Sequence, residues 1–248
     1  MKLSDPKSRS TEPKKVAIVT GASGGIGLVL TQTLLEKGYQ VVGVSRTISK
    51  SKDLVASDDL VLIDGDVGKK ETAIRVADAA LKHFGHIDLL VNNVGMFVPK
   101  NFTQYTEEDF VNMVATNIAT YFFMSQQVIP SMKKQKSGHI VNLASTIAEH
   151  QMGGMALQVI TKSTVPPFTR ALALEYATDG IRVNAVSPGI VDTPMIANLD
   201  HEPLKKFHPI QRLAQTSEIV DAILYLQSAT FVTGENLKVD GGAHAGRW

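Results

Sequence analysis

Cysteine is absent from all 248 residues of the chain. Disulfide bonds, thiolate nucleophiles and thiolate metal sites are therefore excluded, and any catalytic chemistry must come from oxygen and nitrogen groups. The histidines show no metal-ligand spacing with the carboxylates, so no metal site is expected.

A charge excess and a long apolar run are missing as well. Lys and Arg number 25 against 24 Asp and Glu, a formal net charge of +1, which leaves no basic surface to attract nucleic acid or an anionic membrane. No apolar run approaches the roughly 20 residues that cross a bilayer, and the polar start of the chain lacks the apolar centre of a signal peptide. We therefore expect a cytoplasmic protein without nucleic-acid or membrane partners, with a disordered tail over residues 1–14 and a single domain over residues 15–248.

What the chain does contain is a regular alternation of short β-branched runs and longer helical stretches. Strands are predicted at 16–20, 40–45, 60–64, 88–93, 139–145, 181–187 and 235–240. Helices are predicted at 25–37, 69–84, 107–135 with a bend near Pro130, 168–178 and 216–228. Apolar strands separated by helices indicate an α/β protein, a single-domain Rossmann-type doubly wound seven-stranded parallel sheet with helices on both faces.

A glycine-rich turn joins the first strand to the first helix, with the sequence TGASGGIG at residues 20–27. Glycines let the backbone approach a pyrophosphate closely, while free N–H groups at the helix start face the anion. An empty tight turn is the alternative. The context of strand, turn and helix favours dinucleotide binding through Gly21, Ser23, Gly25, Ile26 and Gly27.

An acid is lacking at the end of the second strand. NAD binders place one about 20 residues after the glycine turn to accept hydrogen bonds from the ribose 2′-hydroxyl. Here the chain has Ser45, Arg46 and Thr47. The planar, permanently charged guanidinium suits a 2′-phosphate, with the two hydroxyls as further donors. NADP(H) is therefore predicted over NAD(H), against the alternative of a solvated surface arginine.

The motifs together resemble the short-chain dehydrogenase/reductase family from about Lys15 to Gly242. TGASGGIG is similar to its TGxxxGIG turn. The further matches are Asn92-Asn93-Val94-Gly95 with its NNAG, Asn117 with its helix asparagine, Pro188-Gly189 with its PG turn, and Val239-Asp240-Gly241-Gly242 with its VDGG. This resemblance implies a small carbonyl or alcohol substrate and a homodimer or homotetramer.

The resemblance also implies cofactor contacts along the chain. It places Asp66 and Val67 beside the adenine, Asn93 and Gly95 beside the adjoining ribose, Lys162 on the nicotinamide ribose, and Pro188, Gly189, Ile190 and Thr193 around the nicotinamide.

One residue of the family's catalytic set is absent. In the family a tyrosine protonates the substrate carbonyl, a lysine four residues later lowers the tyrosine pKa, a serine positions the carbonyl, and an asparagine completes a proton path. Ser145, Lys162 and Asn117 match three of these roles, but Gln158 stands at the tyrosine position and no tyrosine occurs between residues 122 and 175. An amide donates a hydrogen bond without releasing a proton near neutral pH. Losing general acid catalysis removes a factor on the order of 10²–10⁴.

Three hypotheses follow from this substitution. The chain is an NADP(H)-dependent oxidoreductase with impaired or altered proton transfer, a catalytically silent dinucleotide-binding sensor or partner subunit, or a lyase or isomerase that uses the same pocket. The loop 190–212, expected to form most of the substrate pocket, has no recognisable signature.

Two further features lie near the catalytic set. Pro166-Pro167 is expected to break the helix that follows Lys162, with Val165 and Pro166 pushed away from helical angles. His150 falls where the family lines the substrate pocket, and a solvent-facing loop histidine is the alternative.

Overall fold

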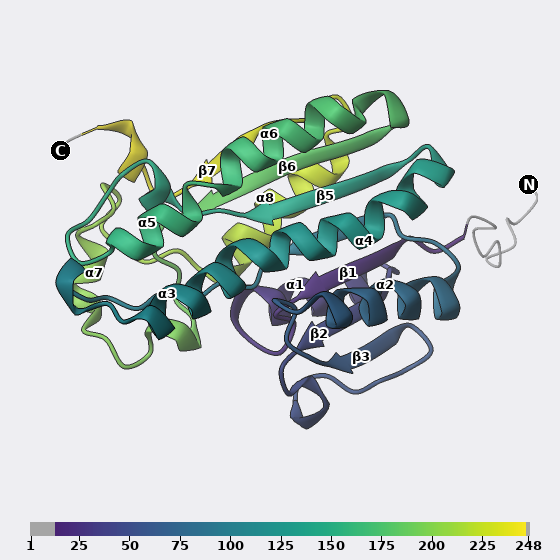
Figure 1. Ribbon diagram of the computed structural model, residues 1–248, viewed down its shortest axis with the longest axis horizontal. Helices are drawn as coiled ribbons and strands as arrows, with labels where there is room; N and C mark the ends of the chain where they lie inside the picture. Colours follow the sequence, from purple (N-terminus) through teal and green to yellow (C-terminus); the bar gives the residue numbers. More distant parts are fainter. Residues whose placement is uncertain (1–12, 247–248) are drawn as a thin grey trace, which may run out of the picture.

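The structure is a computed structural model that describes residues 13–246, so most of the predicted tail, residues 1–12, lies outside the described part. Seven parallel strands form one sheet in the order β3-β2-β1-β4-β5-β6-β7 (Figure 1). Their bounds are β1 Val16–Thr20, β2 Gln40–Ser45, β3 Leu60–Asp64, β4 Leu89–Asn92, β5 Gly138–Leu143, β6 Ile181–Pro188 and β7 Asn236–Val239. The predicted Rossmann-type sheet is confirmed.

Helices cover both faces of this sheet. They are α1 Gly25–Glu36, α2 Lys70–Phe84, α3 Glu107–Val114, α4 Thr120–Gln135, α5 Ala156–Lys162, α6 Val165–Tyr176, α7 His201–Lys205 and α8 Thr216–Ser228. One buried apolar cluster packs α1 and α8 against the sheet, and a second packs α2, α4 and α6 against the opposite face. Figure 1 shows α4 and α6 in front of the sheet and α8 behind it. Among the described residues, no helix has the length and apolar character needed to cross a membrane.

Sheet order places the site. The chain leaves β1 in one direction to form β2 and β3, then returns to the other side of β1 to form β4 and β5. At such a reversal the connections diverge and open a crevice at the carboxyl ends of the strands. The motifs that follow β1, β2, β4, β5 and β6 therefore converge at one edge.

The structure refines the predicted helices in two places. Helix α4 continues through Pro130, and a π-helical turn at Ala115–Ala119 divides the predicted helix 107–135 into α3 and α4; the bend near Pro130 stays a prediction. The predicted break beside Lys162 is confirmed, because α5 ends at Lys162 and α6 begins at Val165. Val165 and Pro166 are nevertheless helical, since a first turn tolerates proline, whose missing N–H has no intrahelical acceptor there.

Candidate active site

A cavity of about 870 Å³ lies at the carboxyl edge of the sheet and collects nearly all the predicted residues. Those that line it are Gly21, Ser23, Gly25, Ile26, Ser45, Arg46, Thr47, Asp66, Val67, Asn93, Gly95, Ser145, Gln158, Lys162, Pro188, Gly189, Ile190 and Thr193. Gly27 and Asn117 lie behind the wall. Seven chain segments, far apart in sequence, thus meet around one space.

The glycine turn presents the start of α1 to this cavity. Gly24 caps α1 without a side-chain hydrogen bond, and Leu28 is the first helix residue whose N–H is bonded to a turn carbonyl, that of Gly24. Gly21 has φ +69°, a conformation that glycine adopts without strain. The N–H groups of Gly21 and Ala22 bond to the Val44 carbonyl, so the free donors are those between Ser23 and Gly27. These are the groups that the sequence predicts to face an anion.

Gly27 acts through packing and not through the cavity wall. A Cβ there would lie 2.2 Å from the Gly21 carbonyl oxygen and 2.7 Å from Asn93 Nδ2. Asn93 in turn donates from Nδ2 to the Thr20 carbonyl oxygen at 2.9 Å. Glycine at position 27 thus lets α1, the turn and the end of β4 pack within contact distance.

The end of β2 carries polar groups without protein partners. Ser45 Oγ is buried and makes no hydrogen bond among the described residues. Arg46 and Thr47 are exposed at the cavity rim, and the Arg46 guanidinium forms no ion pair with any residue between 13 and 246. A buried hydroxyl without a partner is costly, so this position favours a ligand that accepts a hydrogen bond from it.

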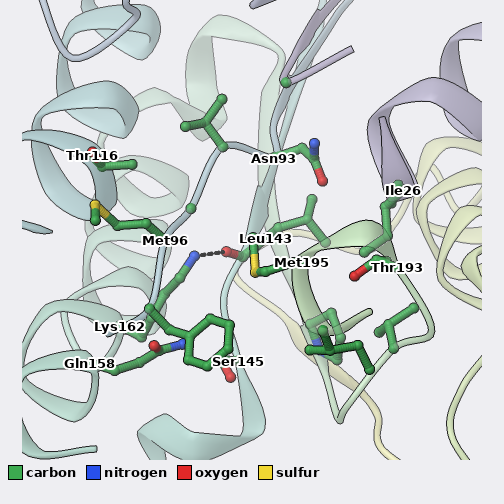
Figure 2. A pocket seen from close by; sticks show the side chains of 18 of the residues that line it. Ile26, Asn93, Met96, Thr116, Leu143, Ser145, Gln158, Lys162, Thr193 and Met195 are labelled. Atoms are coloured by element: carbon green, nitrogen blue, oxygen red, sulfur yellow. Dashed lines mark hydrogen bonds between the residues drawn. The ribbon is translucent and has the colours of Figure 1, made fainter. Parts of the chain in front are cut away.

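The reaction end of the cavity holds Ser145, Gln158 and Lys162 (Figure 2). Ser145 follows β5 and begins the short helix Thr146–Ala148, with its Oγ 3.4 Å from the Ile147 N–H. Gln158 and Lys162 lie one turn apart on α5. Gln158 Oε1 is buried without a hydrogen-bond partner among the described residues. Its amide therefore lacks the internal bonds that would fix it for a purely structural role.

A tyrosine that the sequence reasoning missed contacts Lys162. Tyr121 Oη lies 2.7 Å from Lys162 Nζ, which also donates to the Leu143 carbonyl oxygen at 2.8 Å. Burial lowers the pKa of Lys162 to about 7 and raises the pKa of Tyr121. The available signal was spacing: Tyr121 follows Asn117 by one helical turn.

Asn117 ties the π-helical turn to its surroundings. Its Oδ1 accepts from the Met96 N–H at 2.9 Å, and its Nδ2 donates to the Met96 carbonyl and to Thr161 Oγ1, both at 3.0 Å. Thr161 lies between Gln158 and Lys162 on α5. The position of Asn117 is therefore suited to orienting α5 and the loop after β4.

Apolar side chains also line the cavity. They include Met96, Phe97, Ile147, Met152, Met155, Met195, Ile196, Leu199, Leu204 and Phe207. His150 does not line the cavity and instead packs half-buried against Phe207. His208 is buried, accepts from the Ile190 N–H at 2.9 Å, and thereby holds the loop after β6. Burial lowers the pKa of His208, which keeps this imidazole neutral.

Comparisons with known proteins agree with this geometry. The family model described as Enoyl-(Acyl carrier protein) reductase matches residues 21–244. An acetoacetyl-CoA reductase from Acinetobacter sp. is 35% identical over an alignment of 243 residues that covers 93% of this chain and 98% of that protein.

Solved structures give the same result. A 3-ketoacyl-(acyl-carrier-protein) reductase from Brucella melitensis complexed with NADH superposes with a TM-score of 0.88 at 31% identity, covering 94% of this chain and 99% of that one. ElxO with NADP bound superposes with a TM-score of 0.86 at 28% identity, covering 94% and 100%.

Proposed function

The chain belongs to the short-chain dehydrogenase/reductase family of oxidoreductases, and we propose that it uses NADP(H) to reduce the carbonyl group of a small apolar acyl substrate, with altered proton transfer. The observation that carries this proposal is the convergence of the predicted cofactor residues and of Ser145, Gln158 and Lys162 on one cavity. A phosphate-binding end and a carbonyl-binding end then share a single space.

The residues present fit a dinucleotide. The uncapped start of α1 suits the pyrophosphate, and the unpartnered Ser45 Oγ, with Arg46 and Thr47 beside it, suits a 2′-phosphate. Solved relatives contain NADP in one case and NADH in another. The preference for NADP(H) therefore rests on Arg46 and on the missing acid. When bound, the reduced cofactor supplies a hydride.

The substrate is proposed from the wall and from the relatives. Thioether, phenyl and branched aliphatic side chains surround the reaction end, and these favour an apolar group of variable shape. The Acinetobacter relative is named for reduction of acetoacetyl-CoA. A 3-oxoacyl thioester with a short chain is therefore the first substrate to examine, ahead of simple ketones.

Ser145 and Gln158 are proposed to orient the carbonyl. The Ser145 hydroxyl and the Gln158 amide each offer a donor from the same wall, and neither releases a proton near neutral pH. They hold the oxygen while the carbon accepts the hydride.

The proposal also includes the oligomeric state of the protein and its location in the cell. Phe122 on α4 and Leu174 on α6 are 50% and 83% exposed, and apolar side chains on neighbouring helices support a homodimer or homotetramer. Sedimentation velocity measures this directly. A cytoplasmic location stays a prediction.

The test has two arms. Isothermal titration with NADPH and NADH measures cofactor binding, and NADPH oxidation is then followed with acetoacetyl-CoA, a longer 3-oxoacyl thioester and an activated diketone. We expect tight NADPH binding and turnover that scales with enzyme. Tight binding without turnover on any substrate would favour the silent dinucleotide-binding protein.

A further inference from the structure

Proton donors are scarce at the reaction end. Among residues 13–246, the ionisable side chains that line the cavity are Arg46, Asp66 and Lys162. Arginine does not lose its proton in proteins. Asp66 follows β3, which β2, β1 and β4 separate from β5 in the sheet, and its carboxylate accepts from the Gly68 N–H at 3.0 Å. Lys162 therefore stands alone beside Ser145 and Gln158.

Two of the three N–H groups of the Lys162 ammonium donate to protein acceptors. An ammonium has three donors, and two are used, by Tyr121 Oη at 2.7 Å and by the Leu143 carbonyl at 2.8 Å. Gly95 keeps the space above the nitrogen open, because a Cβ there would lie 3.1 Å from Nζ. Figure 2 shows the ammonium in the cavity wall with its bond to Leu143. The third N–H has no acceptor among the described residues and is left for bound ligands, the nicotinamide ribose that the resemblance places at Lys162 or a substrate oxygen.

Tyr121 is fixed as an acceptor toward this ammonium. Its phenol is 2% exposed and does not line the cavity. The Oη lies 2.7 Å from the Leu143 carbonyl and 3.1 Å from the Val94 carbonyl. The single phenolic proton must go to one of these carbonyls, so the lone pairs face Lys162. Tyr121 can position the lysine but does not reach a substrate.

No charge balances Lys162 within the described residues. Tyr121 of α4 is the only titratable group that contacts it; the groups facing it from β5, from the loop after β4 and from α5 are the Leu143 carbonyl, Gly95 and the neutral Gln158. Burial without a carboxylate disfavours the ammonium, which lowers the pKa of Lys162 to about 7. A group that titrates near the working pH is an efficient general acid.

We propose that Lys162 is the catalytic proton donor of this protein and that Tyr121 is its positioning residue, an inference that rests on the proposed carbonyl reduction. The carbonyl carbon accepts a hydride supplied by the reduced nicotinamide, and the C=O π electrons move to the oxygen. That oxygen takes a proton from Lys162 Nζ, so an O–H bond forms as an N–H bond breaks. The carbonyl is reduced by two electrons, the cofactor is oxidised by two, and the neutral amine regains its proton from solvent through the cavity.

The first test measures the pKa of Lys162 and needs neither cofactor nor turnover. In protein labelled with ¹⁵N-lysine, the Nζ resonance that is missing in Lys162→Met is followed between pH 5 and pH 11. We expect a midpoint near 7 in the wild type and a lower one in Tyr121→Phe, which keeps the ring but removes the acceptor. Tyr105→Phe is the matched control, because Tyr105 Oη bonds the Val98 and Gly154 carbonyls and makes no hydrogen bond to Lys162. A wild-type midpoint above 9, or no change in Tyr121→Phe, would overturn the proposal.

The second test reads the reaction. Reductive kcat/KM with acetoacetyl-CoA should fall as pH rises through the Lys162 midpoint, and this fall should move to lower pH in Tyr121→Phe. Lys162→Met should lose a factor on the order of 10²–10⁴, while NADPH titration shows how much of the loss is binding. Turnover that persists in Lys162→Met with cofactor bound would refute the assignment. Absence of turnover in the wild type would instead refute the proposed carbonyl reduction. The ¹⁵N titration would then still show whether the pKa of Lys162 is lowered and whether it depends on Tyr121.

Discussion

The two ends of the cavity are lined by different kinds of chemical group. At the proposed cofactor end, glycines and backbone N–H groups form the wall, and Gly27 lets α1 pack against the turn. At the proposed reaction end, single side chains form the wall; Gln158 stands where the resemblance predicts a tyrosine, and Tyr121 contacts Lys162 from α4. A backbone site depends on fold geometry, whereas a side-chain site can be reassigned by one substitution. The following measurements test that contrast.

The largest expected effect comes from restoring the phenol. Gln158→Tyr places a proton donor one helical turn from Lys162, so carbonyl reductase activity should rise by about two orders of magnitude. NADPH affinity should barely change, because the cofactor end is untouched. Activity with a diketone and isothermal titration measure the two quantities. Gln151→Tyr, in an exposed loop outside the cavity, is the control.

A loss of activity in Gln158→Tyr would be informative in a different way. It would mean that the Gln158 amide takes part in a mechanism that the phenol obstructs, and it would strengthen the assignment of the proton to Lys162. Unchanged, absent activity with NADPH still bound would favour the silent dinucleotide-binding protein.

Lys162 should also lower the free energy of unfolding, by an amount that depends on pH. Lys162 has a pKa of about 7 in the folded protein, below its ordinary value of 10.5, so between these values the unfolded chain binds more protons at this residue. Its contribution to the free energy of unfolding therefore rises with pH, by at most about 1.4 kcal/mol per pH unit. Below pH 7 both states are protonated and the contribution is constant and unfavourable.

Urea unfolding between pH 6 and pH 9 isolates this effect. At pH 6 the free energy of unfolding should be larger for Lys162→Met than for the wild type. The difference between these two free energies should narrow as pH rises. Lys133→Met, at a half-exposed lysine paired with Asp179, provides the comparison. A constant difference between Lys162→Met and the wild type would mean that Lys162 keeps an ordinary pKa.

The cofactor end gives a smaller effect. Arg46→Ala should weaken NADPH binding roughly tenfold, because a charge-assisted hydrogen bond to phosphate contributes more than about 1 kcal/mol. NADH binding should stay within twofold, since its ribose carries no 2′-phosphate. Paired isothermal titrations provide the measurement, with Arg75→Ala as a control outside the cavity. Equal or tighter binding of NADH by the wild type would contradict the NADP(H) preference.

The smallest expected effect is on amide exchange in the break between α5 and α6. Pro166 and Pro167 have no N–H, and the nearest protected amides on either side are Ser163, bonded to Val159 O, and Phe168, bonded to Thr164 O. Amide exchange at Thr164 and Val165 should be faster than at Ser163 and Phe168. Uniform protection from residue 156 to residue 176 would show that the break has no dynamic consequence.

The sequence predicted one half of the site better than the other for a physical reason. Strand alternation and the glycine turn are local patterns, so the sheet and the wall residues near Gly21 and Arg46 could be predicted from the residues, while the family resemblance supplied the wall residues from Asp66 to Thr193. The contact of Tyr121 with Lys162 joins residues 41 positions apart. The spacing of one helical turn from Asn117 singles out Tyr121 but does not show that it contacts Lys162. The π-helical turn at Ala115–Ala119 carries no comparable signal, whereas α4 continues through Pro130.

The methionines in the cavity wall connect this site to oxidative chemistry. The chain has eight methionines and no cysteine, so thioethers hold all of its sulfur. Four of them, Met96, Met152, Met155 and Met195, line the reaction end, and Met195 is 57% exposed. A peroxide would convert these apolar groups into polar sulfoxides beside a lone ammonium. For the apolar substrate proposed above, we expect oxidation to weaken binding, and we expect methionine sulfoxide reductases, but not thiol reductants, to restore it.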